Sequence, residues 1–163
     1  MQLSKMTRAS VANTDAPVVI PTYVHVITDD TGKIGNVNAT TIRKQIALMN
    51  SDFSGRSSAT AAKSRFTFKV MRITRTRNTR WHNFQFLGSM HEAMAALRVG
   101  GLNALNMYVV NPLWDDGSGV LGWARMPDGN IVDDGIVVAF YTLPGMDTSI
   151  LGKTAPQDRK SVV

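Results

Sequence analysis

Residues 18–28 read VVIPTYVHVIT, and this stretch decides the fold. In an extended strand, alternate side chains point to opposite faces, which places Val24 and Val26 on one face. His25 and Ile27 then lie on the other face. Both faces are mainly apolar, a pattern typical of a strand that is buried on both sides. We therefore expect this strand to lie inside a sheet with helices packed on it.

A helix is predicted at residues 38–53, NATTIRKQIALMNSDF. Its apolar side chains recur at helical spacing and form one stripe: Ile42, Ile46, Met49 and Phe53. Asn38 or Thr40 can cap the first turn, and Gly55 has the conformational freedom that ends a helix. The stripe should therefore pack on the sheet.

A second strand is predicted at residues 65–77, RFTFKVMRITRTR. Apolar residues alternate as far as Val70, and the alternation then shifts by one position to Met71 and Ile73. A shift of this kind indicates a β-bulge or a local twist, because one extra residue reverses the faces that follow it.

The remaining elements complete the fold class. Ser89 and Glu92 have the spacing of a capping box, which predicts a second helix that Gly100–Gly101 ends. Three further strands are expected at residues 104–112, 119–127 and 133–141. This order predicts an α+β (α/β-like) fold with a mixed, twisted five-stranded sheet and two helices. Strands separated by helices should run parallel, and hairpin-linked strands antiparallel.

Composition indicates one globular domain, with 163 residues of which 44% are hydrophobic and 18% are charged. We divide the chain into a flexible N-terminal arm (1–16), the domain itself (17–154) and a polar tail (155–163). No apolar run approaches the roughly 20 residues of a membrane helix, and we read no signal peptide in the first twenty residues. The lack of cysteine excludes disulfides and thiolate metal ligands.

An ordered set of segments resembles the pappalysin-like (cytophagalysin-type) zinc metalloproteases, and most closely the secreted fungal branch of these metzincins. The segments are IPTYVHVIT, KQIALMNSDF, LNMYVV, LGWARMP, DGIVVAFYTLPG and LGKT, running in order from Val18 to Thr154. The resemblance implies the N-terminal subdomain of a metzincin, an extracellular location, polypeptide substrates and zinc as the cofactor of the parent family. In that family zinc activates a water molecule that hydrolyses the peptide bond.

The same resemblance implies that residues 151–154 lead into a helix with the zinc motif HExxHxxGxxH. Here residues 155–163 follow, and they contain no histidine. We therefore expect this chain to be catalytically inactive as written and to bind no zinc. The tail is interpreted as a splice variant, a frameshift or a truncated gene model.

The three histidines do not have metal-ligand spacing. His91 opens the sequence HEAMA, but a zinc helix needs a second histidine at the position that Ala95 occupies. We interpret His91 as a partly exposed neighbour of a capping residue and His25 as a core histidine with hydrogen-bond partners. His82 is placed in a loop after Trp81, with no metal partner indicated.

Two pairs of acids, Asp115–Asp116 and Asp133–Asp134, adjoin glycines in turn sequences. Turn formation through side-chain hydrogen bonds is the favoured interpretation. A calcium site is the alternative, because carboxylates are the ligands that calcium prefers. Nothing else in the sequence supports calcium.

The resemblance singles out one candidate binding segment, Leu121, Gly122, Trp123 and Ala124, as an edge strand that pairs with an extended substrate. Exposed backbone N–H and C=O groups can bond to any extended peptide. The alternative is that Gly122 and Trp123 only form a packed bend and a core aromatic contact.

Three further hypotheses remain open. The first is a non-catalytic decoy or peptide-binding module. The second is a nucleic-acid binder that uses Arg72, Arg75, Arg77 and Arg80, which we disfavour because Arg72 points away from the face of Arg75 and Arg77. The third is self-association through an uncovered apolar sheet face formed by Ile136, Val138 and Phe140.

Overall fold

The structure is a computed structural model, and it describes residues 16–85, 88–113, 119–124 and 131–146. Within these residues the elements are β1 (Val18–Thr28), α1 (Ala39–Phe53), β2 (Phe66–Arg77), α2 (Thr79–His82), β3 (Asn83–Gln85), α3 (Ser89–Leu97), β4 (Leu105–Leu113), β5 (Gly122–Ala124), β6 (Ile136–Ala139) and the 3₁₀ helix η1 (Phe140–Thr142).

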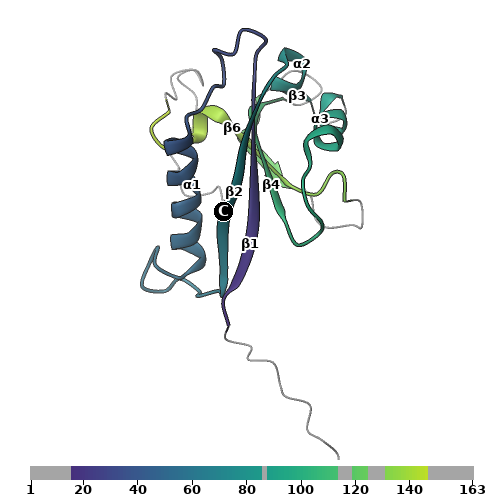
Figure 1. Cartoon of the computed structure of the whole chain (residues 1–163). Helices are drawn as coiled ribbons and strands as arrows, with labels where there is room; N and C mark the ends of the chain where they lie inside the picture. The colour runs from purple at the N-terminus through teal and green to yellow at the C-terminus, as the bar shows by residue number, and fades with distance from the viewer. Residues whose placement is uncertain (1–15, 86–87, 114–118, 125–130, 147–163) are drawn as a thin grey trace, which may run out of the picture.

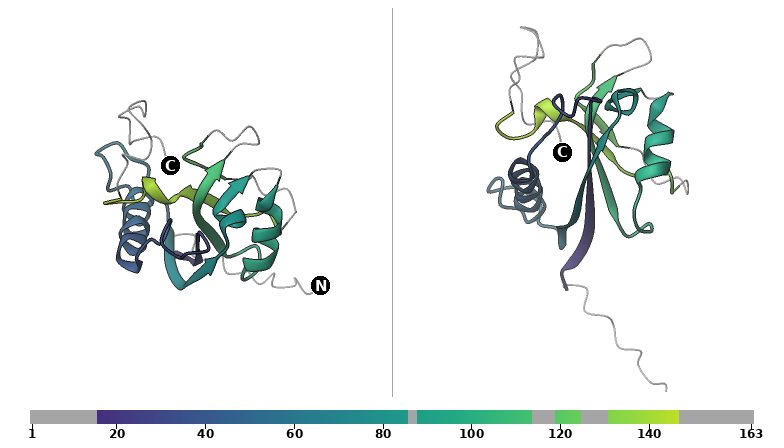
Figure 2. Two further views of the ribbon diagram at one scale, coloured as in Figure 1. Left: turned by 90° about the horizontal axis from the view of Figure 1, so that it is seen from above. Right: turned by 45° about the horizontal axis from the view of Figure 1, so that its top comes forward.

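One mixed sheet has the strand order β2-β1-β4-β6-β5, and β3 pairs with β4 outside this path. The sheet lies between α1 on one face and α3 on the other (Figures 1 and 2). The predicted α+β fold class is confirmed.

The central strand β1 runs parallel to both of its neighbours, β2 and β4. Its second half is enclosed on both faces, since Val24 and Val26 pack in the cluster beneath α1 and Ile27 packs in the cluster beneath α3. His25 lies in the same stretch and is 1% exposed. The expectation of a strand buried on both sides is therefore confirmed.

The predicted irregularity in β2 is a bulge at Met71. Val70 lies opposite Thr22, and the next paired residue is Arg72, opposite Tyr23, so Met71 has no partner on β1. The bulge reverses the faces that follow it, which puts Ile73 against the core cluster beneath α1.

Helix α1 forms as its sequence predicts. The Asn38 side chain accepts a hydrogen bond of 2.8 Å from the Thr41 amide, and Gly55 adopts a positive φ of 73° just past the helix. Ile42 and Ile46 of the predicted stripe are buried. The stripe therefore packs on the sheet, and none of the described helices is long and apolar enough to cross a membrane.

The start of α3 differs from the prediction. Gly88, not Ser89, is the residue that precedes the helix, and no side chain caps it. Glu92 instead binds the guanidinium group of Arg80 through two hydrogen bonds of 2.6 and 2.9 Å. The proposed capping box is therefore wrong, because an ion pair with α2 uses the glutamate that would have reached back to the helix start.

Residues 79–85 form α2 and β3, which the sequence did not predict. The described chain therefore has six strands and three α-helices, where five strands and two helices were expected. Asn78 caps α2 by accepting a hydrogen bond of 3.0 Å from the Trp81 amide. Elements of three and four residues are too short to show a hydrophobic period, which is why they were missed.

Strand β6 lies between β4 and β5, parallel to β4 and antiparallel to β5. The predicted last strand ends at Ala139, where the chain turns into η1 and buries Phe140 to 6% exposure. Ile136 and Val138 are half-buried and pack against the cluster beneath α1. The expected uncovered face is therefore wrong for Phe140, while self-association itself stays a prediction.

The cap of α1 provides a test of this fold. Replacing Asn38 by alanine removes the acceptor for the Thr41 amide and should lower the free energy of unfolding by about 1 kcal/mol. Asn38→Asp retains an acceptor at the same position and should keep most of the stability. Urea denaturation followed by circular dichroism measures both variants, and equal stability of Asn38→Ala and the unaltered chain would contradict the assigned cap.

Candidate functional site

The candidate segment Leu121–Ala124 lies at one end of the sheet. Gly122–Ala124 is strand β5, and in the described part of the chain no further strand lies beyond it. The pairing with β6 places Gly122 opposite Val138 and Ala124 opposite Ile136. The structure thus makes this segment an edge strand.

The backbone groups of β5 alternate between β6 and the free edge. The Ala139 amide donates a 2.9 Å hydrogen bond to the Leu121 carbonyl, so this opposed pair is a hydrogen-bonded one. In an antiparallel pair hydrogen-bonded and non-hydrogen-bonded positions alternate, which makes Trp123 the next residue bonded to β6. The N–H and C=O groups of Gly122 and Ala124 therefore point away from β6, toward the free edge.

The side chains of β5 explain its close packing on β6. A Cβ atom at Gly122 would overlap the carbonyl oxygen of Val137, so only glycine allows this approach. The Trp123 ring packs in the cluster beneath α3, with its centroid 5.9 Å from that of Phe84. A packed bend and a core aromatic contact therefore account for Gly122 and for the Trp123 side chain. This packing does not involve the N–H and C=O groups that point to the free edge.

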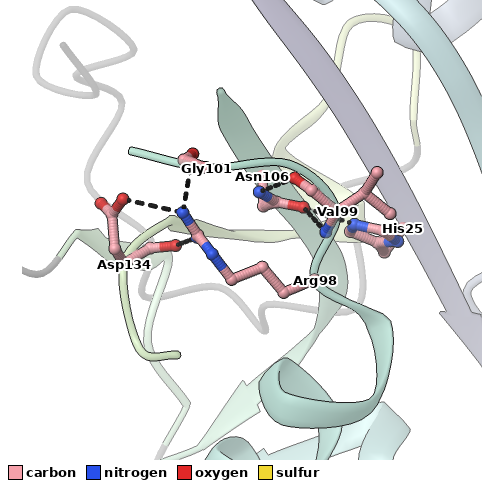
Figure 3. Close-up of polar contacts among 6 residues, drawn as sticks. All are labelled: His25, Arg98, Val99, Gly101, Asn106 and Asp134. Atoms are coloured by element: carbon pink, nitrogen blue, oxygen red, sulfur yellow. Dashed lines mark hydrogen bonds and ion pairs between the residues drawn. The ribbon is translucent and has the colours of Figure 1, made fainter. Parts of the chain in front are cut away.

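His25 has a hydrogen-bond partner at each ring nitrogen, and Figure 3 shows the one from Asn106. Its Nε2 lies 3.0 Å from Asn106 Oδ1, and its Nδ1 lies 2.9 Å from Thr74 Oγ1. The Asn106 amide is oriented by Val99, because its Oδ1 accepts from the Val99 amide and its Nδ2 donates to the Val99 carbonyl. The expectation of a core histidine with hydrogen-bond partners is confirmed.

This network fixes the tautomer of His25. Asn106 Oδ1 is only an acceptor, so the proton must lie on His25 Nε2, and Nδ1 accepts from the Thr74 hydroxyl. Burial lowers the pKa of His25 below its ordinary value of 6.5. The positive charge of Arg72 also lowers this pKa, whereas the hydrogen bond to Asn106 raises it. His25 is therefore predominantly neutral in the folded protein at pH 7.

The other two histidines are also held by the protein. His82 lies in α2, not in a loop as predicted, and it is 3% exposed with Nδ1 2.7 Å from the Ile27 carbonyl oxygen. His91 is largely exposed, and its Nδ1 lies 2.8 Å from Asp133 Oδ1. Among the described residues no group of three or more potential metal ligands comes together. The residues that the structure describes therefore do not fit a zinc ion.

The described acidic pair is bound to basic side chains. Asp133 accepts from His91, and Asp134 Oδ2 lies 3.1 Å from Nη2 of Arg98. The guanidinium group of Arg98 also donates to the carbonyl oxygens of Asp134 and Gly101 (Figure 3). Each carboxylate thus lies against a basic group, which favours the structural interpretation over a calcium site. Asp115–Asp116 lies outside the described residues.

The arginines of the nucleic-acid hypothesis do not form one surface. The register places Arg75 and Arg77 on one face of β2 and Arg72 on the other, as predicted. Arg75 donates to Asn36 Oδ1 and to the Val37 carbonyl. Hydrogen bonds from Arg80 lower the pKa of Glu92, so the Arg80 charge is paired.

Comparison with known proteins finds similar structures and sequences. The solved structure titled mirolysin in complex with compound 9 shares the fold with a TM-score of 0.63 and 23% identity, over 78% of this chain and 55% of that one. An extracellular metalloprotease of Arthroderma benhamiae is 37% identical over 144 residues, which cover 84% of this chain and 43% of that protein. An extracellular metalloprotease of Pyricularia oryzae is 31% identical over 154 residues, covering 90% and 49%. No protein-family model matches.

The chain therefore shares its fold with the mirolysin structure, and the curated relatives it resembles are named extracellular metalloproteases. The chain spans about half the length of the curated relatives it matches.

The buried neutral His25 predicts a stability that depends on pH. As pH falls below about 6.5 the unfolded chain takes up a proton at His25 while the folded chain does not, so the free energy of unfolding should fall. The slope is at most about 1.4 kcal/mol per pH unit and ends at the lowered pKa of the folded state. Urea titrations between pH 8 and 5 measure the slope.

His25→Gln removes this titration and should flatten the curve. The imidazole resonances of His25 provide a second measurement that does not depend on a stable variant. A folded chain in which His25 titrates at or above pH 6.5 would contradict the assigned environment.

Proposed function

We propose that this chain is the sheet-bearing N-terminal part of a secreted, pappalysin-like zinc metalloendopeptidase, and that β5 binds the substrate as an added strand. The observation that carries the proposal is the orientation of Gly122 and Ala124, whose N–H and C=O groups point to the free edge. The fungal relatives, named extracellular metalloproteases, support the protease class and the extracellular location.

The geometry of β5 suits an extended polypeptide of varied sequence. Main-chain hydrogen bonds from Gly122 and Ala124 do not depend on the side chains of the bound peptide. Because Trp123 faces the α3 layer, these two residues face the opposite side of the sheet, and neither carries a bulky group. The substrate side chains on that side therefore meet no obstruction from β5 itself.

Peptide-bond hydrolysis in the parent family is assigned to zinc-activated water. Both ring nitrogens of His25 are bound by protein side chains, His82 Nδ1 is bound by a backbone carbonyl, and His91 is bound by Asp133. We therefore propose that these 163 residues bind peptide without hydrolysing it when they act alone. The alternative function, a decoy or peptide-binding module, uses the same edge and differs only in having no catalytic partner.

Proline at Ala124 tests the edge directly. Proline lacks the N–H that points to the free edge, and an edge strand tolerates it there because no bond to β6 is lost. Ala124→Pro should weaken binding of unstructured casein peptides about two- to tenfold with little change in the free energy of unfolding. Ala124→Thr keeps the N–H and is the matched control. Equal peptide affinity in both variants would show that the peptide binds elsewhere.

The catalytic part of the proposal requires its own measurement. We expect the purified 163-residue chain to contain no stoichiometric zinc and to leave casein intact. A chain that binds one zinc ion and cleaves casein would overturn this expectation. His25→Ala, His82→Ala and His91→Ala, made one at a time, would then identify the ligand.

A further inference from the structure

Tyr141 contacts the segment that leads into the edge strand. It lies in η1, directly after β6, and is 3% exposed within the cluster beneath α1. Its hydroxyl group donates a hydrogen bond of 3.3 Å to the carbonyl oxygen of Val120. The sequence pattern predicts a strand that includes Tyr141, because the apolar run continues past Ala139, where β6 ends.

Val120 is held at both of its backbone groups. Its amide donates a 3.1 Å hydrogen bond to the Pro112 carbonyl at the end of β4, and its carbonyl accepts from Tyr141. Gly119 forms an isolated antiparallel bridge with Leu113. The residues before β5 are thus fixed to β4 on one side and to η1 on the other.

Strand β5 depends on such anchors because it is short. It has three residues, it lies at the sheet edge, and its described backbone pairing is with β6 alone. Short edge strands open locally at low free-energy cost, so each additional anchor changes the population of the paired state. Trp123 supplies an anchor on the α3 face, and Tyr141 supplies one from the cluster beneath α1.

We propose that Tyr141 is a positioning residue: its hydroxyl group fixes Val120, and thereby holds β5 in the alignment that an added peptide strand requires. The peptide part of this inference rests on the proposed function, whereas the effect on β5 does not. Burial raises the pKa of Tyr141, so its hydroxyl group stays protonated and able to donate over the neutral pH range.

Tyr141→Phe removes the hydroxyl group and keeps the ring, which packs edge-on against Phe140 at a centroid distance of 5.2 Å. The amide of Ala139 reports on β5 because it donates to Leu121, and its hydrogen exchange should accelerate about two- to tenfold in the variant. The amide of Val109 in the central sheet should exchange at an unchanged rate. Affinity for casein peptides should fall by a similar factor.

Tyr108→Phe is the matched control. Tyr108 is a second buried tyrosine, its hydroxyl group makes no hydrogen bond to the described residues, and its removal should leave the Ala139 exchange rate unchanged. Unchanged Ala139 exchange in Tyr141→Phe, or equal acceleration at Val109, would overturn the inference. If the unaltered chain binds no peptide, the proposed function fails, and the exchange rates still decide the role of Tyr141.

Discussion

The hydrogen bond between His25 and Asn106 joins the two central strands where water cannot replace it, since both side chains are at most 1% exposed. A buried polar group without a partner costs about 1–3 kcal/mol, so each side chain requires the other. Asn106 also makes two hydrogen bonds to Val99, which fixes the segment that leaves α3. Arg98, the preceding residue, binds Asp134 ahead of β6. One polar chain thus sets the position of β1, β4 and the start of β6 (Figure 3).

The position of β6 in turn determines that of the edge strand. β6 pairs with the buried strand β4 along one edge, in parallel, and with β5 along its other edge, antiparallel. Gly122 allows the close approach, and the contact between Trp123 and Phe84 ties β5 to the layer beneath α3. The edge strand β5 is therefore a peripheral feature whose position derives from the hydrogen-bonded polar side chains in the centre of the sheet.

Local periodicity explains which features could be predicted from the sequence. The bulge at Met71 could be predicted because, without it, the apolar residues that follow would lie on the other face of the strand. The helical turn at residues 79–82 is too short to produce a period, and the Arg80–Glu92 pair joins residues that local patterns do not relate. The position of Tyr141 could not be predicted, because the apolar composition does not change where β6 ends and η1 begins. Contacts between residues far apart in the sequence therefore determine the features that local patterns could not predict.

The two ends of the sheet differ in a way that favours strand addition at β5. At the opposite end, β2 carries Lys69, Arg72, Arg75 and Arg77 on its two faces, and the bulge at Met71 interrupts its pairing pattern. Clustered positive charge and a bulge both discourage an added strand, above all from a second copy of the same chain. In the described residues β5 carries no charge, and its edge presents the backbone groups of Gly122 and Ala124. Of the two edges of the sheet, β5 is therefore the one at which an extended polypeptide can more readily pair.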